Sequence, residues 1–124
     1  MQILRWALIV PAGFAGFILG LLFGFFIYYL GGITCPAQYV TSGTCFAPWS
    51  QAVFDLALVV GAGVAAAAIV VTSALMAPSR HLQVGLVAYC IGAAFATYAA
   101  FETGAWLPYC SAVSVGGLSL WALR

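Results

Sequence analysis

Asp55 and Glu102 are the only carboxylate side chains in the sequence, and they are its candidates for ion or proton chemistry. Two carboxylates brought together titrate as a coupled pair, which suits a cation or proton site. Tyr109 follows closely enough to join them. A carboxylate deep in a membrane implies a function, because its burial is costly. Both acids here nevertheless fall near the ends of long apolar segments, where water can reach them. Two interpretations therefore stay open: hydrated interfacial carboxylates, or a candidate ion site.

Two of the four cysteines, Cys35 and Cys45, bracket a stretch rich in Gly, Pro, Ser and Thr. In an oxidising compartment this spacing predicts a disulfide, which would constrain the unfolded chain by about 2.5 to 3 kcal/mol. Cys110 is a competing partner, and Cys90 lies inside an apolar segment. No C-x-x-C pair is present, which argues against a thiol redox enzyme.

The remaining chemistry-bearing residues point away from catalysis. His81 is the single histidine and follows Arg80 directly, so it reads as a residue at a segment boundary. The sequence has no G-x-S-x-G turn, no phosphate-binding loop and no metal-ligand spacing. We therefore expect no enzyme, no metal and no cofactor.

The composition explains why so few residues could carry out catalysis or bind an ion. Hydrophobic residues make up 66% of the 124 residues and charged residues only 4%, far below the roughly 25% of ordinary soluble domains. A protein of this composition has lipid as the solvent for most of its surface. Its net charge of +1, with no lysine at all, excludes a basic footprint for nucleic acid.

Apolar segments separated by turn residues predict an all-α integral membrane protein, a bundle of four transmembrane helices in one domain covering residues 1–124. The predicted spans are residues 6–30, 51–76, 82–101 and 105–123, and residues 31–50 form an outer loop. The fourth span is the weakest, because its proline and serines also fit a re-entrant or interfacial helix.

Charge placement predicts the orientation. With four spans, Arg5, Arg80 and Arg124 all fall on one side, and the positive-inside rule makes that side cytoplasmic. Both termini are then cytoplasmic, and the 31–50 loop lies outside. The expected location is the inner, or cytoplasmic, membrane of a bacterium.

Small residues recur at every fourth position along the predicted spans. Such stripes let helix backbones approach each other closely, which is how helices associate in lipid. They predict either packing within the bundle or a surplus face that docks onto another subunit, for which the first span is favoured. The residues singled out as a packing or partner face are Gly16, Gly20, Gly24, Gly92 and Ala96.

These observations favour a protein that works by contact. The expected function is that of a non-catalytic accessory or structural subunit, which docks onto other membrane protein subunits through small-residue and aromatic helix faces. The alternative is a small homo-oligomeric transporter or channel with Asp55 and Glu102 at its outer mouth.

Overall fold

The computed structural model describes residues 1–124 and is helical apart from one short hairpin. Its four helices are α1 (Gln2–Ile33), α2 (Ser50–Met76), α3 (His81–Thr103) and α4 (Trp106–Ala122). Between α1 and α2 lie a single 3₁₀ turn (Ala37–Tyr39) and two strands, β1 (Val40–Thr41) and β2 (Thr44–Cys45).

Three of the four helices, α1, α2 and α3, are long and apolar enough to cross a membrane. The fourth predicted span is shorter than expected, because α4 has 17 residues, or roughly 26 Å at 1.5 Å per residue. The hydrocarbon core of a bilayer is about 30 Å thick. Helix length therefore supports three candidate spans.

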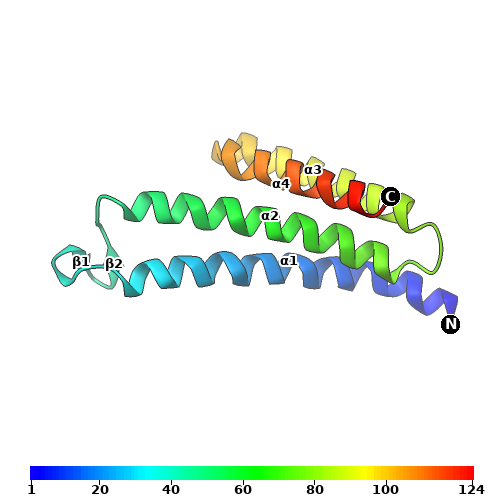
Figure 1. The fold of residues 1–124 in the computed structure, drawn as a ribbon, viewed down its shortest axis with the longest axis horizontal. Coiled ribbons are helices and arrows are strands. Elements are labelled where there is room, and N and C mark those ends of the chain that lie inside the picture. Colours follow the sequence, from blue (N-terminus) through cyan, green and yellow to red (C-terminus); the bar gives the residue numbers. More distant parts are fainter.

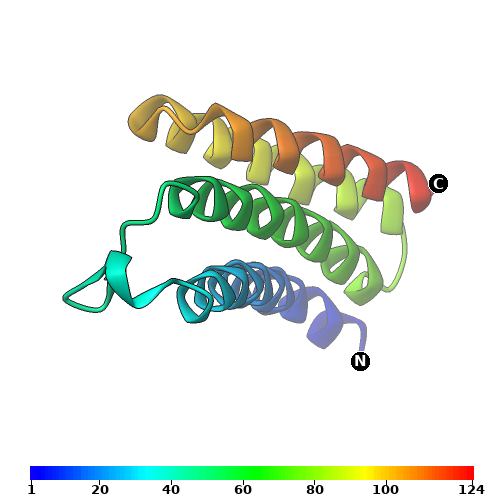
Figure 2. The same ribbon diagram turned by 60° about the vertical axis from the view of Figure 1, so that its left-hand side comes forward.

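The helices are arranged around α2 (Figures 1 and 2). Helix α1 makes its main contacts with α2 on one side, and α3 and α4 pack on the other side of α2 and against each other. Both chain termini lie at the same end of the molecule (Figure 1). This arrangement is open, since α1 has one main neighbour where each helix of a closed four-helix bundle has two.

Glycines bring α1 against the backbone of α2. A Cβ placed on Gly16 would lie 2.9 Å from the carbonyl carbon of Ala68, and one on Gly20 would lie 2.5 Å from the Cα of Ala65. Neither distance leaves room for a side chain. Thr72 Oγ1 donates to the carbonyl of Ala68 on its own helix at 2.6 Å and lies 3.2 Å from the carbonyl oxygen of Ala12 across the same interface. The glycine stripe of α1 is therefore used inside the fold.

Polar side chains also tie α4 to its neighbours. Ser111 Oγ donates to the carbonyl of Val59 on α2 at 2.8 Å, beside Gly63, where a Cβ would meet the serine. The Tyr89 hydroxyl on α3 donates to the carbonyl of Val113 at 3.1 Å. Each contact joins two helices through a backbone acceptor.

The turn between α2 and α3 is short, and it closes with an unusual backbone at Arg80, which has a φ of 58°. His81 Nδ1 lies 2.7 Å from the carbonyl oxygen of Ala74 in the last turn of α2. Because a carbonyl oxygen can only accept, Nδ1 carries the proton in this contact. The single histidine therefore helps to cap a helix end.

We predict that Gly20→Leu destabilises the protein by about 3 kcal/mol or more, because overpacking against backbone cannot be relieved by rotating a side chain. Gly32→Leu is the matched control, since nothing lies within 4 Å of a Cβ there. Thermal unfolding followed by circular dichroism in detergent measures the difference. Equal melting temperatures for the two variants would contradict the packing described here.

Candidate functional site

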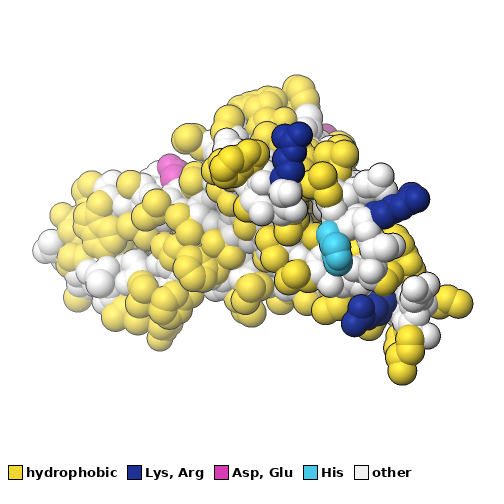
Figure 3. Space-filling model, turned by 45° about the vertical axis from the view of Figure 1, so that its right-hand side comes forward, with side chains coloured by type: hydrophobic (Ala, Val, Ile, Leu, Met, Phe, Trp, Pro, Cys, Tyr) yellow, Lys and Arg dark blue, Asp and Glu magenta, His cyan; other side chains and the backbone are white.

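The charged side chains divide between the two ends of the molecule. Arg5 lies in the first turns of α1, Arg80 precedes α3, and Arg124 follows α4, all at the end where the two termini lie. Figure 3 shows the arginines and the histidine gathered at this end, and hydrophobic side chains over much of the rest of that face. Asp55, near the start of α2, and Glu102, at the end of α3, belong to the opposite half.

The two carboxylates lie on different helices, and both are exposed. Asp55 is exposed and accepts a hydrogen bond from Gln51 Nε2 at 3.2 Å, one turn earlier on the same helix. Glu102 is exposed in the last turn of α3. The hydroxyl of Tyr109, expected beside them, lies instead 3.3 Å from Thr97 Oγ1. No group of three or more His, Cys, Asp or Glu side chains is placed to hold a metal ion.

The predicted disulfide between Cys35 and Cys45 is present, with the two Cα atoms 6.1 Å apart. It closes a β-hairpin in which Val40 pairs with Cys45 and Thr41 with Thr44. The residues at the tip, Ser42 and Gly43, have φ values of 52° and 80°. Positive φ at both positions is the geometry of a type I′ turn, which matches the twist of paired strands.

Sequence reasoning predicted this segment only as a loop. The Ser-Gly dipeptide between two threonines was the signal that would have identified the hairpin. The other two cysteines, Cys90 and Cys110, are free and exposed. Cys110 therefore does not compete for either member of the disulfide.

The residues singled out as a packing or partner face separate into two groups. Gly16 and Gly20 are buried and Gly24 half-buried, all three against α2. Gly92 and Ala96 line a cleft between α3 and the two helices α2 and α4, and nothing lies within 4 Å of a Cβ built on Gly92. The small-residue face left open in this chain is therefore that of α3, where the sequence had favoured α1.

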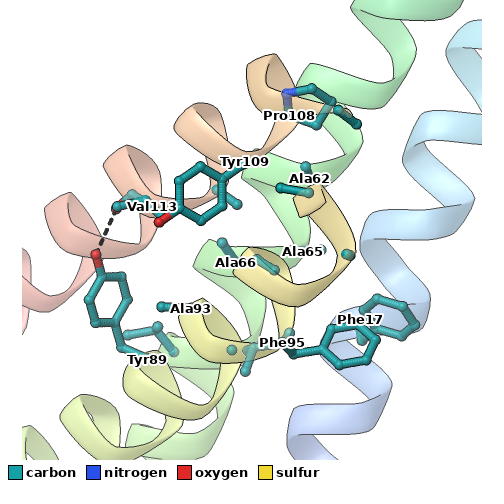
Figure 4. Close-up of a pocket in the computed structure, with 18 of the residues that line it drawn as sticks. Phe17, Ala62, Ala65, Ala66, Tyr89, Ala93, Phe95, Pro108, Tyr109 and Val113 are labelled. Atoms are coloured by element: carbon teal, nitrogen blue, oxygen red, sulfur yellow. Dashed lines mark hydrogen bonds between the residues drawn. The ribbon is translucent and has the colours of Figure 1, made fainter. Parts of the chain in front are cut away.

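This cleft was not predicted from the sequence; a larger hollow, of about 850 Å³, lies between the hairpin and the adjoining ends of α1 and α2. The volume of the cleft is about 250 Å³, and 17 of its 20 lining residues are hydrophobic. Figure 4 shows Tyr89 and Tyr109 at one side of it and Phe17 and Phe95 at the other, with alanines of α2 between them. The tyrosine hydroxyls already have partners, Val113 and Thr97, so the cleft offers little free polarity.

An aromatic cluster lies at the end of the cleft nearest the turn between α3 and α4. Trp106 packs edge-on against Phe101, with ring centroids 5.1 Å apart, and against Tyr109, at 5.8 Å. Edge-to-face pairs of this kind contribute about 0.5 to 1.5 kcal/mol beyond their buried area. They hold the end of α3 against the start of α4, while the small side chains further along α3 leave space.

Comparisons with protein-family models, with curated proteins and with solved structures found no match to this chain.

We predict that Cys35→Ser together with Cys45→Ser lowers the free energy of unfolding by about 2.5 to 3 kcal/mol, the entropy of closing the hairpin loop. The matched control is Cys90→Ser with Cys110→Ser, which removes the two free thiols. Chemical denaturation in detergent compares the pairs. Maleimide labelling in denaturant should count two thiols in the unreduced native chain and four after reduction; four before reduction would show that the disulfide does not form.

Proposed function

We propose that this chain is a non-catalytic accessory or structural subunit of a larger membrane protein complex, integrated in the membrane with both termini on the cytoplasmic side. The observation that carries the proposal is the position of α1. It has one main neighbour, α2, and its opposite face has none.

That opposite face is a regular stripe of large apolar side chains, which we call the outer stripe of α1. Its members recur at intervals of three or four residues, as one face of a helix requires. All are exposed: Phe14, Ile18, Leu22, Phe25 and Tyr29. The glycines lie on the side that packs against α2, so close packing fixes α1 while the aromatic side stays free for a helix of another subunit.

The use of polar groups supports a role in contact. Side-chain hydroxyls of the helices bond to backbone carbonyls, as Thr72, Ser111 and Tyr89 do, and no buried side-chain nitrogen or oxygen lacks a partner. Catalytic sites keep polar groups available for a substrate. Here Ser111 and Tyr89 join two helices, and Thr72 bonds to a carbonyl within α2.

The orientation follows from the arginines. Three positive side chains at one end, with no lysine or arginine at the other, fit the positive-inside rule for a cytoplasmic face. The disulfide-bonded hairpin then lies outside, where oxidising conditions maintain the bond. We propose the cytoplasmic membrane of a bacterium as the location.

The alternative, a homo-oligomeric transporter or channel, would need Asp55 and Glu102 to act on a passing ion. Both carboxylates are exposed, and Asp55 pairs with a glutamine of its own helix. The accessory role therefore has the stronger structural support.

We predict that Leu22→Ala with Phe25→Ala releases the chain from its partner and leaves its own fold unchanged, because both side chains are largely exposed, at 62% and 67%. Loss of a central aromatic contact costs about 2 kcal/mol, or roughly thirty-fold in affinity. Native electrophoresis in mild detergent, with partner subunits identified by mass spectrometry, measures the loss, and a thermal melt verifies the fold.

Matched controls are Leu107→Ala with Leu118→Ala on α4, which are exposed to a similar extent. These, and Asp55→Asn with Glu102→Gln, should leave the complex intact. A wild-type chain that migrates only as a homo-oligomer, and that loses an ion flux with the latter pair, would favour the transporter instead.

We predict that, in a chain carrying Cys90→Ser and Cys110→Ser, a membrane-impermeant maleimide added to intact cells labels Glu102→Cys and spares Ser79→Cys, since the two positions lie in exposed turns at opposite ends. A cysteine appended after Arg124 reports on α4. Protection there means that α4 crosses the membrane, and labelling means that it returns to the outer face. Labelling of Ser79→Cys with protection of Glu102→Cys would invert the proposed orientation.

A further inference from the structure

The arginines form an exposed basic surface at the end of the molecule where the termini lie (Figure 3). Arg5, Arg80 and Arg124 are all exposed, and we call them together the arginine end. Both carboxylate side chains of the protein, Asp55 and Glu102, belong to the opposite half, so they do not neutralise it. The two chain termini also lie at this end, and their opposite charges cancel. The arginine end therefore has no anion of its own.

Helix lengths place the arginine end at the level of lipid headgroups, given the membrane placement proposed above. Helix α1 rises roughly 34 Å from Trp6 to Tyr29, and α3 rises roughly 32 Å from His81 to Glu102. Both lengths slightly exceed the hydrocarbon core, which is about 30 Å thick. The residues at these helix ends therefore lie just outside the hydrocarbon, where the phosphates of the lipids are.

Two tryptophans mark the same level. Trp6 directly follows Arg5, and Trp121 lies about one turn before Arg124. Both are exposed, at 46% and 74% of their surface. Tryptophan is enriched at the membrane interface, where its ring sits among the headgroups. A surface that met only water or a soluble acidic partner would not gain from large exposed apolar rings beside its charges, so the pairing of tryptophan with arginine favours a lipid.

The third arginine occupies a backbone position that glycine would adopt more readily. Arg80 has a φ of 58°, in the left-handed region, which is unfavourable for a residue with a Cβ. The contact of His81 Nδ1 with the Ala74 carbonyl, at 2.7 Å, ties this turn to the end of α2. An arginine here keeps a guanidinium at the surface even though the backbone would be less strained with glycine.

We propose that the arginine end binds the headgroup phosphates of anionic phospholipids in the cytoplasmic leaflet. A guanidinium offers parallel N–H groups that match the oxygens of a phosphate, and it stays charged at the interface. The chain uses arginine for every such position and has no lysine. The positive-inside rule accounts for the side that the arginines take during insertion, whereas this proposal concerns what they bind there.

This inference rests on the membrane placement proposed above, and not on the outer stripe of α1 or on any partner subunit. It is tested on the purified full-length chain in vesicles, where no partner is present. Flotation verifies insertion. A chain that does not insert contradicts the membrane placement itself, whereas an inserted chain without a lipid preference overturns this inference alone.

The test compares how strongly the chain holds an anionic and a zwitterionic lipid. Vesicles of phosphatidylethanolamine and phosphatidylglycerol carry a trace of spin-labelled phosphatidylglycerol or of spin-labelled phosphatidylcholine. Electron paramagnetic resonance measures the fraction of each labelled lipid that is immobilised against the protein. The test variant carries Arg5→Gln, Arg80→Gln and Arg124→Gln, and the matched control carries lysine at the same three positions, which keeps the charge.

Wild type and the lysine variant should hold phosphatidylglycerol about fivefold more strongly than phosphatidylcholine, and the glutamine variant should hold the two about equally. Inorganic phosphate should displace the labelled phosphatidylglycerol no more than sodium chloride of the same ionic strength does. If the glutamine variant does not fold, Arg80→Gly takes its place. Because glycine suits the φ of that turn, Arg80→Gly should melt at the same or a higher temperature and show a weaker preference than wild type.

Three results would overturn the proposal. The first is an inserted wild type with no preference for phosphatidylglycerol, which would leave an acidic protein as the partner of this surface. The second is a glutamine variant that keeps the full preference of wild type. The third is displacement by inorganic phosphate beyond that by chloride, which would indicate a site for a soluble anion.

Discussion

The contact of α1 with the backbone of α2 is the constraint on which the rest of the structure depends. In lipid, helices gain nothing from burying apolar surface against each other, so close backbone approach and hydrogen bonds must hold them. On α1, Gly16 and Gly20 allow that approach, and they pack against Ala68 and Ala65 of α2. Because α2 also presents Gly63 to Ser111 of α4, it is packed closely on two sides and becomes the centre of the molecule.

Much of the helical layout could be predicted from the sequence, because apolar length and turn residues are local signals. The second span was expected at 51–76 and is Ser50–Met76, ended by the Pro78 turn; α1 extends beyond both predicted ends. Two features could not be predicted from the sequence. Whether a small-residue stripe pairs depends on which helices become neighbours, and this is why Gly16 and Gly20 turned inward while Gly92 stayed open. The other feature is the length of α4. This helix begins only at Trp106, after Gly104 has ended α3 with a φ of 70°, and it ends at Ala122.

The polar residues show why chemistry is hard to find in this chain. Thr72, Thr97, Ser111 and Tyr89 look like available hydroxyls in the sequence, yet each donates to a main-chain carbonyl. The single histidine does the same at the end of α2. A polar group that is already satisfied inside an apolar protein stabilises the fold. The cleft accordingly has a mostly apolar lining with few free polar groups.

In the membrane placement proposed above, the unequal lengths of the helices have a consequence for the bilayer. Helix α1, with 32 residues, is roughly 48 Å long, and α4 is roughly 26 Å. A hydrocarbon core of about 30 Å cannot match both. On the α1 side the helix would tilt or carry its ends into the headgroups, whereas beside α4 the bilayer would thin or flanking side chains would reach to the interface. Such hydrophobic mismatch would make the protein asymmetric in how it deforms the membrane, and it would favour neighbours that relieve the strain on each flank.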